Sequence, residues 1–286
     1  MVASKYVTGI GLIIVAIVAF AVGMFASPMI FPVSGVDTVW ENIVKTGKMT
    51  IGTDPTWEPY EFLNTTTGKI VGFEVELMDT IAGKLGLTTE WQSTMFDSII
   101  LSVQSKTLDL GVSGFSVTQK RLEVVDFTAP HSKAVGQVIM LQSRRDELGI
   151  TTLTALSNLT DYNLPNGLKV GTQSGTTEEE ELMAAIPSNK QGSLILSYDS
   201  YDKAFLALKD GSVDCVYAET PITTNWISKL QTTYGKTTVV VYSVPYYYVA
   251  FMANKDARFL VSQINAALLE LTLTGQLDAL KLKWHA

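Results

Sequence analysis

Two short segments carry the residues best suited to bind a small charged molecule. The run Gly111–Arg121 passes through small residues and ends at an arginine, whose planar guanidinium can pair with a carboxylate through two parallel hydrogen bonds. The segment Gln173–Thr177 joins an apolar stretch to an acidic one, and at a helix N-terminus its free N–H groups would suit a carboxylate or a phosphate. Both features also have a structural explanation, because Arg121 could form a surface salt bridge and the threonines could simply cap a helix.

Residues for catalysis or metal binding are scarce in this chain of 286 residues. Its two histidines, His131 and His285, lie far apart, and no His-x-x-x-His, Gly-x-Ser-x-Gly or Gly-x-x-x-x-Gly-Lys motif is present. The densest acidic run, Glu178–Glu181, is typical of the first turn of a capped helix. The single cysteine, Cys215, excludes an intrachain disulfide and is expected to be a buried, inert thiol. We therefore expect no catalytic residue, no metal site and no cofactor.

The charge of the chain argues against a nucleic-acid partner. The formal net charge is −7, and the longest basic cluster is Arg144-Arg145. Because an acidic surface repels phosphate backbones, binding to nucleic acid is not expected.

The N-terminus carries a long uncharged stretch. No charged residue occurs between Lys5 and Asp37, and the run Gly11–Phe25 is almost entirely apolar. This length favours an uncleaved transmembrane anchor over a signal peptide, although Ala19-Phe20-Ala21 matches a peptidase site and leaves cleavage open. With Lys5 on the cytoplasmic side, either interpretation places residues 37–286 outside the cell membrane, anchored to it or secreted.

Strands and helices alternate after this stretch. Residues 48–53 have a strand pattern, and the apolar positions 77, 78, 81, 82 and 85 mark one face of a helix that should end at Gly86. A second helix is expected over residues 97–105 and a second strand over 108–112. This alternation predicts βαβ units and a mostly parallel sheet.

The same order of features occurs a second time. The strand pattern at residues 168–172 repeats that around Ile51 at an offset of 119 positions, and Asp214 repeats Asp109 at an offset of 105. The repeat predicts two lobes of similar build, although any two βαβ units share some likeness. An amphipathic stretch at 259–273 has no counterpart after the first unit. If it returns to the first lobe, the chain crosses between the lobes twice, leaving a cleft for a ligand and a hinge that permits closure.

Several segments, taken together, resemble the extracytoplasmic amino-acid-binding proteins of ABC importers, known as solute-binding protein family 3. They occur in the order typical of that family across residues 40–286. The matching segments are Ile51-Gly52-Thr53-Asp54, Glu58-Pro59-Tyr60-Glu61-Phe62, Gly72-Phe73-Glu74-Val75-Glu76-Leu77, Phe96-Asp97-Ser98-Ile99-Ile100, Thr118-Gln119-Lys120-Arg121, Val125-Asp126-Phe127-Thr128, Gly175-Thr176-Thr177 and Lys283-Trp284.

The resemblance implies an α/β, two-lobe periplasmic-binding-protein fold. Such a fold has two parallel or mixed sheets with flanking helices and a two-strand hinge, here preceded by the transmembrane segment. We expect the anchor at residues 1–36, one lobe at 37–135 and 247–286, and the other at 136–246. The implied protein is a monomer that delivers an amino acid to the membrane subunits of an importer.

The resemblance also implies a ligand site. Arg121 would hold the α-carboxylate together with backbone N–H groups at Thr176 and Thr177. The ammonium group would meet the Gly114 carbonyl, the Ser116 hydroxyl and the Glu219 carboxylate. Side-chain contacts would come from Trp57 and Phe96, with Asp54 and Gln173 at the specificity end. Taken alone, Trp57 could equally be a core residue.

The sequence departs from the family pattern at a few positions. Glu219 stands where the family usually has aspartate, and His131 stands where tyrosine is common, which suggests a structural role near the hinge. Glu74 and Glu76 also replace aspartates, and we expect no consequence at a helix start.

Two alternatives share the fold. The first is an enzyme resembling cyclohexadienyl dehydratase, for which Glu219 or His131 would have to serve as general acid or base. The second is a ligand-sensing ectodomain of a signalling protein.

Overall fold

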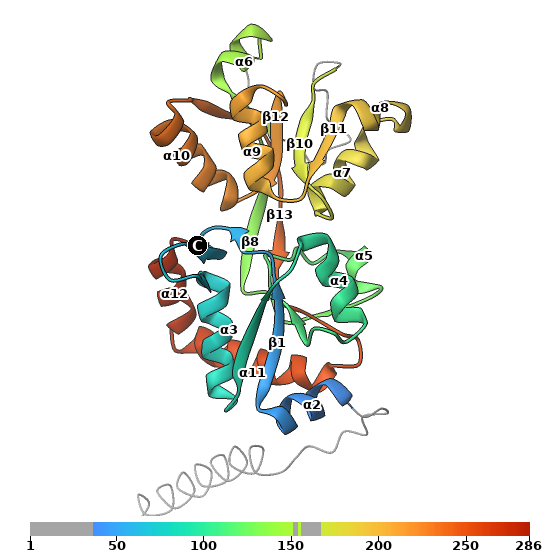
Figure 1. Cartoon of the computed structure of the whole chain (residues 1–286), viewed down its shortest axis with the longest axis vertical. Helices are drawn as coiled ribbons and strands as arrows, with labels where there is room; N and C mark the ends of the chain where they lie inside the picture. Colours follow the sequence, from blue (N-terminus) through green and yellow to red (C-terminus); the bar gives the residue numbers. More distant parts are fainter. Residues whose placement is uncertain (1–36, 151–153, 156–166) are drawn as a thin grey trace, which may run out of the picture. The chain divides into compact units, whose positions relative to one another are not determined.

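Two α/β lobes, each built on its own sheet, make up residues 37–286 (Figure 1). The computed structural model describes residues 37–150, 154–155 and 167–286. The predicted α/β architecture with two lobes and mixed sheets is confirmed. In the described part of the chain no helix is both long and apolar enough to cross a membrane. The anchor predicted at residues 1–36 lies outside the described residues.

The first lobe contains a five-stranded sheet in the order β5-β1-β6-β14-β7. Strand β1 pairs in parallel with β5 and β6, whereas β14 pairs antiparallel with β6 and β7. The strands are β1 (Lys48–Thr53), β5 (Thr88–Ser93), β6 (Leu110–Gly111), β7 (Asp126–Phe127) and β14 (Met252–Ala253). The helices are α2 (Thr38–Thr46), α3 (Phe73–Lys84), α4 (Phe96–Gln104), α5 (Gln119–Leu122), α11 (Arg258–Leu273) and α12 (Gln276–Trp284). A small sheet of β2 (Thr56–Trp57), β3 (Glu61–Asn64) and β4 (Lys69–Val71) completes this lobe.

The second lobe contains a six-stranded mixed sheet in the order β11-β10-β12-β8-β13-β9. Strand β10 is parallel to its neighbours β11 and β12, and β8 is antiparallel to both β12 and β13. The strands are β8 (Ser132–Leu141), β9 (Thr154–Ala155), β10 (Val170–Gln173), β11 (Ile195–Tyr198), β12 (Cys215–Glu219) and β13 (Thr238–Val249). The helices are α6 (Gln142–Glu147), α7 (Thr177–Ala185), α8 (Ser188–Leu194), α9 (Tyr201–Asp210) and α10 (Ile222–Tyr234).

The apolar spacing read from the sequence corresponds to the buried face of α3. Leu77, Met78 and Ile81 have no exposed surface, and they pack in the same core as Ile51 of β1. The helix ends at Lys84, and Gly86 has a positive φ of 72°, which glycine adopts without steric cost. The predicted C-terminal stop is therefore confirmed.

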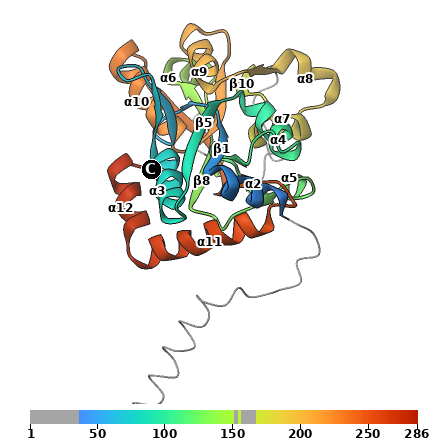
Figure 2. The same ribbon diagram turned by 60° about the horizontal axis from the view of Figure 1, so that its bottom comes forward.

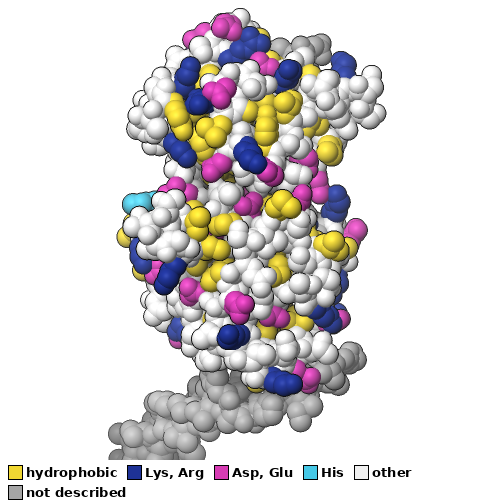
Figure 3. Space-filling model, viewed as in Figure 1, with side chains coloured by type: hydrophobic (Ala, Val, Ile, Leu, Met, Phe, Trp, Pro, Cys, Tyr) yellow, Lys and Arg dark blue, Asp and Glu magenta, His cyan; other side chains and the backbone are white. Residues whose placement is uncertain are grey.

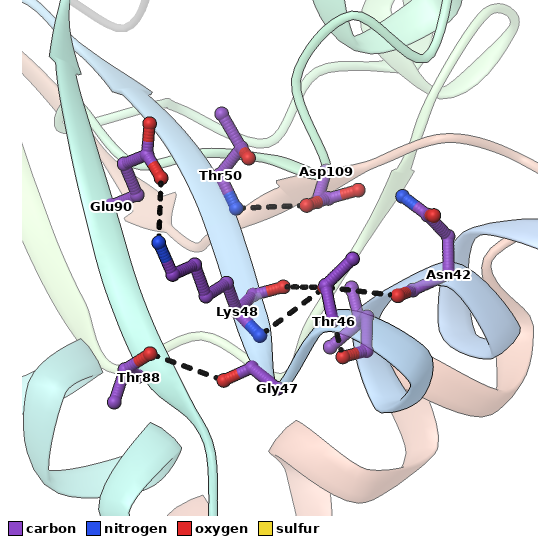
Figure 4. Close-up of polar contacts among 9 residues, drawn as sticks. Asn42, Thr46, Gly47, Lys48, Thr50, Thr88, Glu90 and Asp109 are labelled. Atoms are coloured by element: carbon purple, nitrogen blue, oxygen red, sulfur yellow. Dashed lines mark hydrogen bonds and ion pairs between the residues drawn. The ribbon is translucent and has the colours of Figure 1, made fainter.

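Both lobes use the same internal brace, which supports the predicted repeat. In the first lobe the Asp109 carboxylate accepts a hydrogen bond from the backbone N–H of Thr50 at 2.8 Å (Figure 4). In the second lobe Asp214 accepts from the backbone N–H of Lys169, also at 2.8 Å. Lys169 follows Thr50 by 119 positions and Asp214 follows Asp109 by 105, which are the two offsets seen in the sequence. The central strands β1 and β10 thus occupy equivalent positions, each between two parallel neighbours.

Two antiparallel strands, β8 and β13, connect the lobes (Figure 1). After β13 the chain adds β14 to the first sheet, and α11 packs near α2 and α3 of the first lobe (Figure 2). The backbone N–H of Phe259, at the start of α11, also donates to the Asp37 carboxylate at 3.0 Å. The predicted return of the C-terminal stretch to the first lobe is confirmed. The boundaries predicted at 135/136 and 246/247 fall within the two connecting strands.

Candidate ligand-binding site

A cavity lies between the two lobes and is lined by residues of both. All ten residues singled out from the sequence line it, and the structure thus brings together segments from both lobes. These ten are Asp54, Trp57, Phe96, Gly114, Ser116, Arg121, Gln173, Thr176, Thr177 and Glu219. Four further residues complete the wall: Thr56, Ser113, Glu178 and Tyr201.

Arg121 is held in place by the first lobe. It lies in the short helix α5, whose N-cap Thr118 accepts from the Arg121 N–H at 3.2 Å. Its guanidinium carbon lies 5.7 Å from the ring centre of Phe96 and 5.5 Å from that of Phe115, distances that allow cation–π attraction. One guanidinium nitrogen, Nη1, donates to the Ser116 carbonyl at 2.9 Å. Burial lowers the pKa of this guanidinium, but an arginine keeps its charge in proteins.

Gly114 allows an aromatic ring to lie against the backbone of the same lobe. Its φ is 59°, and a Cβ atom placed there would come within 2.1 Å of the Trp57 ring. A larger residue would therefore displace the indole. Trp57 itself packs edge-on against Tyr60, with ring centres 5.0 Å apart.

Asp54 follows β1 at the carboxyl end of the strand. Its backbone N–H donates to the Ser113 hydroxyl at 3.0 Å, and its carboxylate accepts from Thr56 at 3.1 Å and from Gln173 Nε2 at 2.6 Å. Burial raises the pKa of Asp54 to about 6, and the hydrogen bonds from Gln173 and Thr56 oppose that rise.

The second lobe contributes a strand end and a helix start. Gln173 ends β10, and Thr176 caps α7 by accepting from the Glu179 N–H at 3.3 Å. The first turn of this helix, with the positive end of the helix dipole, lies at the cavity wall, where Thr177 also lies. This arrangement suits a carboxylate.

Glu219 ends β12 and reaches the first lobe, where its carboxylate accepts a hydrogen bond from the Ser116 hydroxyl. Burial raises its pKa to about 7, whereas the Ser116 hydrogen bond and the charge of Arg121 act to lower it. The family that the sequence resembles usually has aspartate at this position. The longer side chain of glutamate is thus compatible with a contact across the cleft.

Further hydrogen bonds span the two lobes around the cavity. Arg121 Nη2 donates to the Gly175 carbonyl at 3.2 Å, in addition to the Gln173–Asp54 and Ser116–Glu219 bonds described above. On the surface, Lys120 and Glu180 form an ion pair at 2.8 Å. On the face drawn in Figure 3, several acidic side chains lie where the two halves of the body meet.

Sequence reasoning missed Glu178 as a cavity residue. Its run was interpreted as the acidic first turn of a capped helix, and α7 does begin at Thr177 with three acidic residues in that turn. Glu178 nevertheless lies in the cavity wall and is only 2 % exposed, while Glu179 and Glu180 are partly exposed. Its position directly after the threonine pair was the available signal. Tyr201, also missed, donates to Glu178 Oε2 at 3.2 Å.

His131 and Glu74 form a buried pair behind the cavity wall. Their side chains are fully buried, with Nε2 of His131 3.0 Å from Oε1 of Glu74. The other oxygen of Glu74 accepts from the Gly114 N–H at 2.9 Å. The structural role predicted for His131 is consistent with this position. The expectation that replacing aspartate by Glu74 has no consequence at a helix start stays a prediction, and the Glu74 carboxylate itself holds the backbone of a cavity residue.

No group of three or more His, Cys, Asp or Glu side chains in the described part of the chain is arranged to hold a metal ion. The acidic residues of the cavity are instead bonded to hydroxyl, amide and phenol donors.

Comparison with known proteins adds three findings. Residues 49–286 match the model of the bacterial extracellular solute-binding proteins, family 3. The chain is 26 % identical over 239 residues to ABC transporter arginine-binding protein 1 of Escherichia coli, covering 83 % of this chain and 90 % of that protein. An ancestral arginine-binding protein bound to arginine superposes with a TM-score of 0.72 at 27 % identity, over 84 % of this chain and 99 % of the other.

A further comparison concerns the fold alone. An ancestral amino acid-binding protein described as a precursor of cyclohexadienyl dehydratase superposes with a TM-score of 0.72, over 86 % of this chain and 99 % of that chain. Its sequence identity is 24 %.

Proposed function

The chain belongs to the bacterial extracellular solute-binding proteins of family 3, and from this premise we propose that it is an extracytoplasmic receptor for a free amino acid. It captures the amino acid between its two lobes and delivers it to the membrane subunits of an ABC-type importer. The observation that carries the proposal is the single cavity in which a buried arginine, a helix N-terminus and Glu219 converge from two lobes.

The two charged ends of an amino acid have separate partners in this proposal. The α-carboxylate binds Arg121 and the N–H groups at Thr176 and Thr177. The ammonium binds Glu219, with the Gly114 carbonyl and the Ser116 hydroxyl. A zwitterion loses much hydration on entering a cavity, and charge-assisted hydrogen bonds, each contributing about 1.5–3 kcal/mol, offset that loss. Because the partners come from both lobes, the ligand favours the closed arrangement.

The charge balance of the cavity favours a ligand with a basic side chain. Three acids, Asp54, Glu178 and Glu219, line the cavity with one cation, Arg121. A zwitterion adds equal positive and negative charge and leaves the acids in excess, whereas a cationic side chain reduces the excess. Asp54, with Gln173, would receive that side chain, and Trp57 and Phe96 would flank it. The arginine-binding relatives support this assignment.

We propose, further, that the protein works as a monomer held at the outer face of the cell membrane by residues 1–36. The uncharged stretch between Lys5 and Asp37 supports the anchor. Cleavage within that stretch would release the same receptor in soluble form.

The binding function is favoured over catalysis. His131, one of the two general acid or base candidates, pairs with Glu74 and is not part of the cavity wall. Glu219 remains as the candidate for an enzyme on the same fold, since its pKa of about 7 would suit proton transfer. Loss of any amino acid or cyclohexadienyl compound during incubation with the protein would favour that alternative.

Titration calorimetry of the purified full chain against the twenty amino acids and a few dipeptides tests the proposal. The protein is first unfolded and refolded so that it carries no ligand. We expect one-to-one binding of one or a few amino acids, basic ones first, with Kd of about 1 μM or tighter. No binding across the panel by a folded protein would refute the amino-acid receptor.

A further inference from the structure

Two buried carboxyl groups of the second lobe share one end of the cavity. Glu178, at the start of α7, is 2 % exposed, and Glu219, at the end of β12, is 4 % exposed. Both lie in the same cavity wall, close enough for the two carboxyl groups to interact electrostatically. Oε1 of Glu178 has no hydrogen-bond donor among the described residues. Because two buried carboxylates in one cavity wall repel each other, a single proton held by the pair would remove that repulsion.

The groups packed around the pair supply little compensating charge. Tyr201 of α9 donates to Glu178, and Ser116 donates to Glu219. Arg121 of α5 is the cation that acts on Glu219, and it acts on Glu178 as well. From α7 itself, Glu180 and Glu181 add negative charge near the site.

Glu181, another acid of α7, has its own hydrogen-bond donors. Tyr217 of β12 donates to Glu181 at 2.5 Å, and Tyr247 of β13 donates to its other oxygen. These phenols therefore serve Glu181, and neither supplies a proton to the Glu178–Glu219 pair. Two buried acids with one arginine between them leave an excess negative charge that a shared proton removes.

The pKa shifts agree with a shared proton. Burial and the charge of Glu219 raise the pKa of Glu178 well above its ordinary value. Burial raises the pKa of Glu219 to about 7. Two interacting acids titrate as a unit, so near neutral pH the pair retains one proton.

We propose that Glu178 is a ligand-facing residue that shares one proton with Glu219 in the free protein, and that the ammonium group of the ligand displaces this proton. The proposal rests on the amino-acid receptor function. The ammonium brings its own N–H donors and its own positive charge, so that the shared proton becomes redundant. The proton passes to the solvent, and no covalent bond to carbon forms or breaks.

The pair has a consequence for selectivity. A ligand with an ammonium group can satisfy two carboxylates, whereas a neutral analogue of the same shape leaves the proton in place and gains little. Glu178 thereby strengthens the preference for ammonium ligands that Glu219 alone would provide. It also makes affinity rise with pH while the free pair remains protonated, by up to about tenfold per pH unit.

Calorimetry in buffers of different ionisation enthalpy measures this proton directly. L-Arginine is titrated into the refolded full chain near pH 6.5, in phosphate and in imidazole buffer. We expect release of about one proton per ligand bound. In Glu178→Gln, whose neutral amide neither titrates nor repels the Glu219 carboxylate, the release should fall close to zero. The matched control is Glu123→Gln, an exposed acid of the first lobe, which should release as much as the wild type.

The outcomes separate this proposal from the function on which it rests. Binding of L-arginine with no dependence on the buffer, or equal proton release in Glu178→Gln, would refute the shared proton and leave the receptor intact. No heat with any amino acid would refute both.

Infrared difference spectra give a test that needs no ligand. At neutral pH the free wild type should show the C=O band of a protonated carboxyl group, and that band should be weaker in Glu178→Gln. The same spectrum for both proteins would refute the proposal.

Discussion

The two lobes hold their buried acids in different ways, although both use the same βαβ core. In the first lobe, Glu74 divides its oxygens between His131 and the Gly114 N–H, and Glu61 accepts from Ser113 at 3.1 Å. In the second lobe, Glu178 and Glu219 line the cavity, where they accept hydrogen bonds from Tyr201 and from Ser116 of the first lobe. Glu74 and Glu61 of the first lobe lie outside the cavity wall and support the fold, whereas the second-lobe acids line the cavity, where a ligand would meet them.

The largest effect should come from breaking the first-lobe pair. Glu74→Ala should lower the free energy of unfolding by about 3–5 kcal/mol, because it leaves the His131 ring and the Gly114 N–H buried without an acceptor. Urea unfolding measures the loss. In the second lobe, Glu178→Gln should cost less than about 1 kcal/mol, because the amide still bonds its neighbours. If Glu74→Ala and Glu178→Gln lowered the free energy of unfolding equally, the buried acids of the two lobes would not differ in how they support the fold.

Arg121 links the two lobes and should dominate binding. We expect Arg121→Ala to weaken amino-acid binding by about 2–4 kcal/mol while the fold stays intact, because the carboxylate loses a bidentate, charged partner. Calorimetry measures the affinity, and circular dichroism checks the fold. Lys120→Ala, which removes the neighbouring surface cation, is the matched control and should change affinity by less than about 1 kcal/mol. Unaltered affinity in Arg121→Ala would exclude this arginine from the site.

Glu219 tests whether the second-lobe acids act on the ligand. Glu219→Gln should weaken binding of an amino acid by about 1.5–3 kcal/mol, the contribution of a charge-assisted hydrogen bond. Binding of the des-amino analogue should change far less, since that compound has no ammonium to lose a partner. Competition titrations with both compounds measure the difference. Equal weakening of the two would show that Glu219 does not contact the ammonium.

The smallest effect concerns the pH dependence of stability without ligand. Because burial raises the pKa of Asp54 from 3.8 to about 6, the folded protein binds more protons than the unfolded chain between those values. The free energy of unfolding should therefore fall as pH rises from about 4 to 6, by less than about 1.4 kcal/mol per pH unit for this group. Glu219 contributes with the same sign up to about pH 7.

The Asp54→Asn variant isolates the contribution of that group. Its amide does not titrate, so urea unfolding at several pH values should give a shallower slope than in the wild type. A slope as steep as that of the wild type would show that Asp54 titrates normally in the folded protein. The comparison also indicates how much of the pH dependence comes from each lobe.

Local spacing in the sequence determined most of the architecture. The alternation of strands and helices, the repeat around Ile51 and Val170, and the stop at Gly86 all follow from residues close together in the chain. The resemblance to the solute-binding family assigned ten separate residues to one site, and all ten line one cavity.

Only the tertiary structure decided which acid lines the cavity. Glu178 and Glu179 are neighbours with the same side chain and the same helical propensity, yet one lies buried in the cavity wall and the other is partly exposed. The pairing of Glu74 with His131 likewise joins residues far apart in the chain. Such contacts depend on how helices pack on sheets and how two lobes meet, and the spacing of residues along the chain does not encode that geometry.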